Sequence, residues 1–435
     1  MKAFAKKTFR FVFVITFILS AAFSLILPAS ASSAPSLDSA HAVILYSVDA
    51  DEILLAKNPD LPIYPAATVK IMSSLLLCEL LEDKLDEKIT LTEQMLLGTV
   101  GRSFGLKVGE KMTVRHLLQI AICGSYNDAF CALAVYSSGS LSDFVSLMNE
   151  KAQALGANAT NFVNATGIDN PKAQTTARDI LKIAKTAAEN KLYMEQNSMY
   201  SDQVVLGNGT TKTVTNRNEL HNIYGKYYNN HALGFAAGMT DLGGYCVATL
   251  GSYSGAKYIC IVMNTKENAE YELANSLLSF AGENYSVAVL RESGTVVGKL
   301  PITLSDSYSE IPIALASDVK ILKSANTSAD TDLSYDLVLT KSELRAPVEK
   351  GEQVGFYVVR NGNDIIACVP VVTAQGAERN LILGAIDDMK NTITSRSTLA
   401  ALLFFAVSFV TFVIVCIVIK QKKRKKTVYA RGRYR

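Results

Sequence analysis

The segment Pro65-Ala66-Ala67-Thr68-Val69-Lys70 contains the most informative residue pair of the chain, a lysine three positions after an alanine. In a helix that opens with Ser-x-x-Lys, the hydroxyl and the amine lie at i and i+3 on one face, within proton-transfer reach. Here Lys70 is present, but Ala67 stands where the serine would be. Thr68 cannot replace it, because a step of one residue rotates a helical side chain by about 100°. The segment therefore has the form of a nucleophilic site that lacks its nucleophile.

Two further short motifs accompany this segment. Ser125-Tyr126-Asn127 has the form Ser-x-Asn and stands between two halves of a predicted helical region. Ala236-Ala237-Gly238-Met239 begins a predicted strand and precedes a pair of glycines. Each motif is weak by itself, since a Ser-x-Asn triplet is frequent by chance in a chain of this length. Their interest is that all three occur together.

The elements that must position these motifs form one predicted α/β domain, residues 38–285. Strand-like runs lie at its two ends, and their sequences are HAVILYSVDADEILLAKN, YCVATLGSY and AKYICIVMN. Helical periodicity begins at Thr68 and recurs over 113–139, 141–156, 176–190 and 271–280. Strands from both ends with helices between them predict a mixed α/β fold with an antiparallel sheet. Residues 286–378 are richer in short β runs and predict a small β-sandwich domain, followed by a partly helical linker over 379–398.

Both ends of the chain carry long apolar runs. Residues 1–31 have the charged, apolar and small-residue order of a secretory signal peptide, with cleavage expected after Ala31. An uncleaved membrane anchor is the alternative, because the apolar run is rather long. Residues 399–419 hold no charge and predict a transmembrane helix, and residues 420–435 form a basic tail. By the positive-inside rule this tail is cytoplasmic, so the large domain is extracellular and the protein crosses the membrane once.

The net charge of +3 hides an acidic body. Between the signal peptide and the tail the chain has 30 basic and 40 acidic residues, a net charge of −10. This balance argues against a nucleic-acid partner. The seven cysteines lack metal-ligand spacing, and no metal or cofactor is predicted. Cys246 and Cys260 flank a predicted hairpin and could face each other, although buried free thiols are the favoured interpretation.

With these motifs the chain resembles the D-alanyl-D-alanine carboxypeptidases, the low-molecular-mass penicillin-binding proteins. The resemblance runs from about Ala40 to Ala374 and includes YPAATVKIMSSLL, LLQIAICGSYNDAFCALA, FVNATGIDN and APVEKGEQVGFYVV. The signal peptide, catalytic-type domain, β-rich domain and C-terminal anchor also stand in the order that this family uses. The resemblance implies a transpeptidase-like fold, a place in the cell envelope and the stem peptide of peptidoglycan as substrate.

The resemblance also implies a role for each motif position. A serine at position 67 would attack the D-Ala-D-Ala carbonyl, Lys70 would deprotonate it, and Ser125 would pass a proton to the leaving amine. Asn127 would orient the lysine and bind the substrate amide. The third motif would be Lys-Thr-Gly, which supplies positive potential and a hydroxyl for the terminal carboxylate. The backbone N–H groups of residues 67 and 239 would form the oxyanion hole.

This chain departs from that pattern at three positions, which are Ala67, Ala236 and Ala237. Losing the nucleophile costs on the order of 10⁶ in turnover in comparable enzymes. The sequence therefore predicts a pseudoenzyme that binds a peptidoglycan stem peptide or an envelope protein. Lys70, Ser125 and Asn127 are the predicted remnants of the catalytic site, and the Gly238 and Met239 backbones are the predicted substrate-binding groups.

Two alternatives remain open at this point. One is an active serine-type carboxypeptidase that trims peptidoglycan pentapeptides, and the other is a membrane-anchored scaffold of an envelope complex. Lys70 likewise has two interpretations, as a cation that binds substrate or as a partly buried lysine satisfied by Ser125 and Asn127.

Overall fold

The computed structural model describes residues 33–253, 255–324, 333–394 and 396–431. The chain divides into two compact units. The first contains the residues up to Val289 and Lys320–Thr331, and the second contains Leu290–Val319 and Asp332–Arg435. The predicted signal peptide, residues 1–31, lies outside the described residues.

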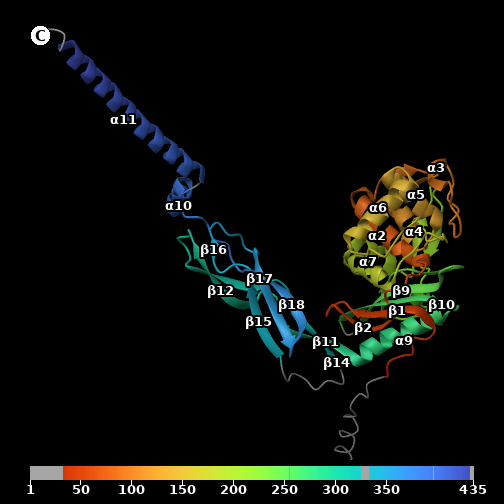
Figure 1. The fold of residues 1–435 in the computed structure, drawn as a ribbon. Coiled ribbons are helices and arrows are strands. Elements are labelled where there is room, and N and C mark those ends of the chain that lie inside the picture. The colour runs from red at the N-terminus through yellow and green to blue at the C-terminus, as the bar shows by residue number, and fades with distance from the viewer. Residues whose placement is uncertain (1–32, 254, 325–332, 395, 432–435) are drawn as a thin grey trace, which may run out of the picture. The chain divides into compact units, whose positions relative to one another are not determined.

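The first unit is built on an antiparallel sheet of six strands in the order β2-β1-β10-β9-β7, with β8 also paired to β9 (Figure 1). β1 and β10 pair from Ala40↔Thr265 to Ser47↔Tyr258, so the prediction of a sheet made from both ends of the domain is confirmed. The strands are β1 (Ala40–Ser47), β2 (Glu52–Lys57), β7 (Ala232–Gly234), β8 (Ala237–Thr240), β9 (Gly244–Tyr253) and β10 (Ala256–Thr265).

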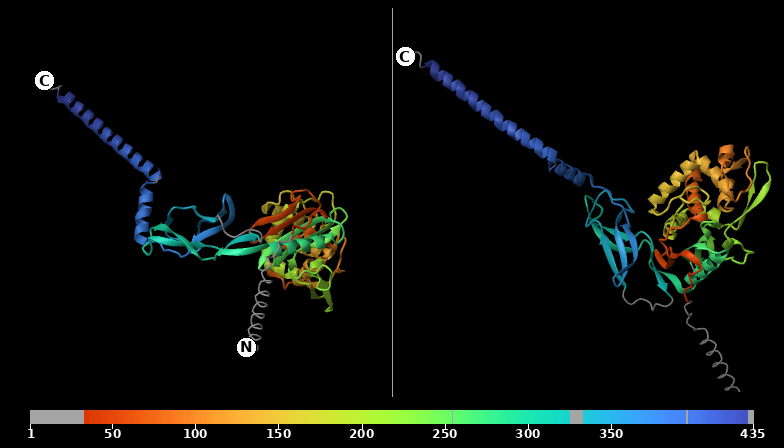
Figure 2. Two further views of the ribbon diagram at one scale, coloured as in Figure 1. Left: turned by 90° about the horizontal axis from the view of Figure 1, so that it is seen from below. Right: turned by 45° about the vertical axis from the view of Figure 1, so that its right-hand side comes forward.

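Helices cover both faces of this sheet, as the views of Figures 1 and 2 agree. Ile44 of β1 belongs to the core shared with most of the helices, whereas its neighbours Val43 and Leu45 belong to the core shared with α9. A strand buried on both faces is apolar at nearly every position, which explains the continuous run AVILY. The helices on the first face are α2 (Val69–Leu81), α4 (Val114–Ile122), α5 (Asn127–Ser138), α6 (Leu141–Ala154), α7 (Ala177–Glu189) and α8 (Lys191–Ser198), and α9 (Ala269–Asn284) covers the second.

Side-chain caps set the starts of three of the predicted helices. The hydroxyls of Thr113, Ser140 and Thr176 accept hydrogen bonds from the backbone N–H three residues on, at the first turns of α4, α6 and α7. Smaller elements were not predicted from the sequence. They are η1 (Ala66–Thr68), η2 (Glu82–Lys84), α3 (Glu93–Leu96), η3 (Glu219–His221) and the hairpins β3 (Lys88–Thr90) with β4 (Lys111–Thr113) and β5 (Ser201–Val205) with β6 (Thr211–Thr215).

The disulfide alternative for Cys246 and Cys260 is wrong. Both are free buried thiols, and Cys260 pairs across the sheet with Thr249 instead. Cys246 faces the core beneath the helices and Cys260 faces the core beneath α9. Because successive side chains of a strand point to opposite faces, this register keeps the two sulfur atoms on opposite sides of the sheet. Cys368, by contrast, is exposed.

The second unit carries the β-rich domain and the C-terminal helices. Its sheet has the order β15-β17-β18-β13-β12-β16, whereas the separate ribbon of β11 paired with β14 belongs mostly to the first unit. The strands are β11 (Tyr285–Arg291), β12 (Val296–Thr303), β13 (Glu310–Leu315), β14 (Val319–Ser324), β15 (Leu333–Leu339), β16 (Leu344–Arg345), β17 (Gln353–Asn361) and β18 (Asp364–Thr373).

Two helices end the chain, α10 (Leu381–Thr394) and α11 (Arg396–Arg431). Within α11, the stretch Ala400–Lys420 has a mean hydropathy of 3.1 and is wholly exposed, so among the described residues it is long and apolar enough to cross a membrane. Helices α5 and α6 are long and apolar enough only when they are taken together, but they meet at an angle of 85°, and α5 is buried in the core.

Candidate functional site

Ala67 and Lys70 lie at the junction of η1 with α2. Ala66 has a φ of +47°, and its carbonyl oxygen faces Gly167 so closely that a Cβ on Gly167 would lie 2.0 Å from it. Only glycine permits this approach, which fixes the entry of the chain into the helix. Ala67 is half-buried and Lys70 is 8% exposed. The helix thus presents a buried amine and, three residues before it, a methyl group.

Ser125 stands in the break between α4 and α5, and it faces Lys70. The Lys70 Nζ donates hydrogen bonds to the carbonyl oxygen of Ser125 at 2.7 Å and to its Oγ at 2.9 Å. Ser125 has a φ of +56°, which a non-glycine residue adopts only when its surroundings enforce it. The lysine amine also lies 5.3 Å from the centroid of the Phe130 ring. The structure therefore brings the first and second motifs together.

In this structure Asn127 does not orient Lys70, which is the first of the two roles that the resemblance implies. Its Nδ2 donates to the carbonyl oxygen of Val100 at 2.7 Å, and among the described residues no hydrogen bond joins it to Lys70. The interpretation of Lys70 as satisfied by both residues therefore holds for Ser125 alone. The Oδ1 of Asn127 is buried and has no hydrogen-bond partner among the described residues. It is an acceptor left open at the start of α5.

The third motif lies against the first. A Cβ on Gly238 of β8 would lie 2.9 Å from the Cβ of Ala67, so the backbone of the strand passes directly over the nucleophile position. Ala236 packs on the core between the sheet and the α2 face, which contains Val69 and Ile71. Ala237 is 4% exposed and belongs to the core between the sheet and α9. Met239 is 48% exposed. The alternation of the strand thus places residues 236 and 238, but not 237, on the side of Ala67.

Two arginines complete the charge pattern, and sequence reasoning missed both. Burial, followed by the positive charges of Arg102 and Arg217, lowers the pKa of Lys70 to about 7. Both arginines are exposed. Arg102 lies in the loop before β4, and Arg217 lies just after β6. Neither stands at a spacing that marks a motif, because the two arginines lie about thirty and about 150 residues after Lys70 in the chain and only folding brings them near it. Their only sequence signal is their charge.

The pKa of Lys70 predicts a pH-dependent stability. Above pH 7 the native protein releases the Lys70 proton, while the unfolded chain keeps it up to about 10.5. The unfolded state then binds more protons, so the free energy of unfolding rises with pH. From pH 7 to pH 9 we expect Lys70 to contribute a rise of about 2 kcal/mol. Urea unfolding of the wild type and of a Lys70→Met variant at both pH values isolates this contribution, and parallel pH profiles would contradict it.

The fold and the three facing motifs define a protein of the penicillin-binding-protein class. The family model described as D-alanyl-D-alanine carboxypeptidase matches residues 29–267, and that of the penicillin-binding protein 5 C-terminal domain matches residues 285–379. The chain therefore belongs to the D-alanyl-D-alanine carboxypeptidase family, a family of the cell wall. The family resemblance stated from the sequence is confirmed.

Individual relatives cover most of the chain. D-alanyl-D-alanine carboxypeptidase DacF of Bacillus subtilis is 25% identical over 358 residues, which are 81% of this chain and 89% of the relative. DacA of Haemophilus influenzae is 28% identical over 382 residues, 83% of this chain and 91% of the relative. The solved structure of penicillin-binding protein 5 from Haemophilus influenzae superposes with a TM-score of 0.66 at 23% identity, covering 80% of this chain and all of that one. The likeness of that structure concerns the fold.

Proposed function

We propose that this protein is a catalytically inactive member of its family that binds the stem peptide of peptidoglycan without cleaving it. The observation that carries the proposal is the surroundings of the Lys70 amine. The amine is bonded to Ser125, while the position that should offer it a hydroxyl is the methyl group of Ala67. A lysine that has no nucleophile to deprotonate cannot start acyl transfer.

The third motif supports the same proposal. Ala236 lies on the side of Ala67 and supplies no charge, and Ala237 supplies no hydroxyl. An active family member needs positive potential there to hold a terminal carboxylate and to stabilise a developing oxyanion. The hydroxyl that the chemistry requires is thus absent from the first motif and the positive charge from the third, although β8 packs closely on η1.

The surroundings of Lys70 retain groups that suit a peptide ligand. The Arg217 guanidinium makes no ion pair or hydrogen bond among the described residues and is close enough to act on Lys70, so it can accept a terminal carboxylate. The buried Oδ1 of Asn127 has no hydrogen-bond partner among the described residues, and its chemistry suits an amide N–H. The backbone N–H groups of Ala67 and Met239 are the candidate donors to the carbonyl of the peptide. Lys70, Ser125 and Asn127 are thus proposed as binding remnants of a catalytic site.

The proposed location follows from the ends of the chain. Residues 399–419 would anchor the protein in the cell membrane, with residues 420–435 in the cytoplasm and the carboxypeptidase-like domain, 38–285, outside. The β-rich domain, 286–378, and the linker, 379–398, would separate that domain from the anchor. With this topology the site would lie where nascent cell wall is available.

Calorimetry on the full-length protein in detergent tests the proposal. A pentapeptide that ends in D-Ala-D-Ala should bind saturably, and no D-Ala should be released. We expect Arg217→Gln to weaken binding about tenfold, since one charge-assisted hydrogen bond is lost. The matched control is Arg115→Gln, whose arginine pairs with Asp86 on the surface and should leave the affinity unchanged.

The two alternatives are outcomes of the same experiment. Release of D-Ala by the wild type would contradict the proposal and favour an active carboxypeptidase. Absence of binding by a correctly folded protein would favour a scaffold whose former cleft is not used. Equal affinities for the wild type and Arg217→Gln would contradict the assignment of the carboxylate site.

A further inference from the structure

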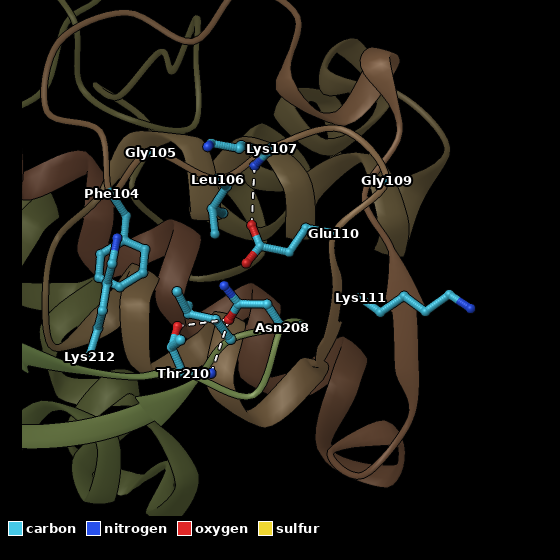
Figure 3. Close-up of a pocket in the computed structure, with 12 residues that line it drawn as sticks. Phe104, Gly105, Leu106, Lys107, Gly109, Glu110, Lys111, Asn208, Thr210 and Lys212 are labelled. Carbon is cyan, nitrogen blue, oxygen red and sulfur yellow. Dashed lines mark hydrogen bonds between the residues drawn. The ribbon is translucent and has the colours of Figure 1, made fainter.

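A second pocket lies beside the candidate site, between the loop that precedes β4 and the turn of the β5–β6 hairpin (Figure 3). Its volume is about 560 Å³. The groups that line it and matter here are Phe104, Lys107, Glu110, Asn208, Thr210 and Lys212. Lys111 also lines it, but in Figure 3 its side chain points away from Phe104 and Glu110. None of the three motifs contributes to this pocket.

The pocket is held open by a buried carboxylate. Asp128, which is 2% exposed, accepts hydrogen bonds from the Ser103 hydroxyl and from the backbone N–H groups of Phe104, Gly105 and Leu106, at 2.7 to 3.1 Å. Four charge-assisted bonds to one carboxylate fix the conformation of the loop. The wall of the pocket is therefore formed before any ligand arrives.

The opposite wall is fixed as well. Gly207, in the turn of the β5–β6 hairpin, lies against β4, and a Cβ on it would lie 2.7 Å from the carbonyl oxygen of Lys111. The Asn208 side chain accepts hydrogen bonds from the backbone N–H and the hydroxyl of Thr210. The turn is thus anchored to the first wall and is rigid in itself, which lowers the entropy cost of binding.

A ladder of two cation–ring contacts and one ring pair, which runs from Arg102 through Tyr126 and Phe104 to Lys212, connects this pocket with the site around Lys70. The Arg102 guanidinium lies 4.3 Å from the Tyr126 ring centroid, the Tyr126 and Phe104 rings meet edge to face at 5.2 Å, and the Lys212 amine lies 5.0 Å from the Phe104 ring. Tyr126 directly follows Ser125, so the ladder begins at the lysine site and ends in the pocket. Cations held on ring faces keep a fixed place without an acidic partner.

The charge of the pocket is opposite to that of the body. Lys107 and Lys212 line it with a single carboxylate, Glu110, in a body of net charge −10. Glu110 also accepts a hydrogen bond from the backbone N–H of Lys107, at 3.2 Å. A local excess of positive charge on an acidic protein attracts anionic groups and disfavours cationic ones.

We propose that this pocket is a second subsite for the peptide bound at the Lys70 site, and that it holds a carboxylate internal to that peptide. The inference rests on the proposed function, and it names the ligand as an acidic peptide with two carboxylates. The terminal one lies at Arg217, and the internal one lies between Lys107 and Lys212. Glu110, Asn208 and Thr210 accept or donate hydrogen bonds to the neighbouring amide groups.

The mixed chemistry of the pocket favours a peptide over a phosphate polymer. Glu110 would repel a phosphodiester, whereas it suits an amide or amine beside a carboxylate. The amide of Asn208 and the hydroxyl of Thr210 offer both donors and acceptors. The ladder, moreover, runs from one subsite to the other, as an extended ligand requires.

Two forms of one pentapeptide test this inference on the full-length protein in detergent. Both end in D-Ala-D-Ala, and one carries an internal side-chain carboxylate that is amidated in the other. We expect the acidic form to bind the wild type about tenfold more tightly. In the double variant Lys107→Gln/Lys212→Gln both forms should bind with the affinity of the amidated form. The matched control Lys191→Gln/Lys257→Gln removes two exposed lysines outside the pocket and should keep the preference.

Each other outcome has a distinct meaning. Equal binding of both peptides to the wild type would overturn the subsite and leave the proposed function standing. Binding of neither peptide would overturn both. A preference for the acidic peptide that survives in the double variant would also overturn the subsite. If, in addition, a glycerol-phosphate polymer bound the wild type but not the double variant, the pocket would be a site for that polymer instead.

Discussion

Full-length protein incubated with a fluorescent penicillin should carry no covalent label after denaturation. Acylation requires a nucleophile, and residue 67 offers a methyl group where the family pattern has a serine hydroxyl. Removal of a catalytic nucleophile lowers turnover by about 10⁶ in a serine protease, and an acyl-enzyme cannot form at all without the attacking atom. The measurement is in-gel fluorescence after long incubation at a saturating concentration.

Penicillin-binding protein 5 of Haemophilus influenzae, whose structure shares this fold, serves as the positive control. Thermal unfolding of the unlabelled protein establishes that an absence of label does not reflect misfolding. A stoichiometric label that survives denaturation would contradict the proposed function. Mapping that label by mass spectrometry would then identify the hydroxyl or thiol responsible.

The second large effect concerns the reconstruction of the site. Ala67→Ser alone should acylate at least about a hundredfold more slowly than the double variant Ala67→Ser/Ala236→Lys, because one missing preorganised charge beside the reacting centre costs roughly 10²–10³. Ala236 is the position to change in this test, because it lies on the same side of β8 as Gly238, whose backbone covers Ala67. Acylation rates from stopped-time penicillin labelling measure the difference.

Ala237 is left unchanged in this design for a structural reason. It is 4% exposed in the α9 core, and a threonine there would place a hydroxyl among apolar side chains. The variant Ala67→Ser/Lys70→Met is the control that should remain unlabelled, because the base is then absent. Rapid labelling of Ala67→Ser alone would show that the empty third motif does not limit the chemistry.

The two expected results have a common basis in the backbone conformation of the site. The backbone features that build the site, the φ of +47° at Ala66 and of +56° at Ser125, are present although residue 67 has no hydroxyl and residue 236 has no charge. Such conformations cost free energy and are retained only where surrounding packing enforces them. A site whose frame is intact and whose nucleophile is missing is suited to holding a ligand that it does not cleave.

Much of the architecture could be predicted because its signals are local. Thr113, Ser140 and Thr176 are capping residues before apolar periodic runs, and each begins a helix in the structure. The hairpin β5–β6 was not predicted, because Ser201–Val205 and Thr211–Thr215 are polar at most positions and lack the apolar alternation that marks a strand. That hairpin forms one wall of the second pocket, so the pocket was equally hidden.

By itself the sequence determined the family, the order of domains and the three replacements at Ala67, Ala236 and Ala237, because these depend on residue identity and on spacing along the chain. Only the tertiary structure decided that Lys70 bonds to Ser125 and not to Asn127, and that Arg102 and Arg217 lie near its amine. The physical reason is distance: electrostatic and hydrogen-bonding partners are set by proximity in space, and here they come from segments about thirty to about 150 residues apart in the chain.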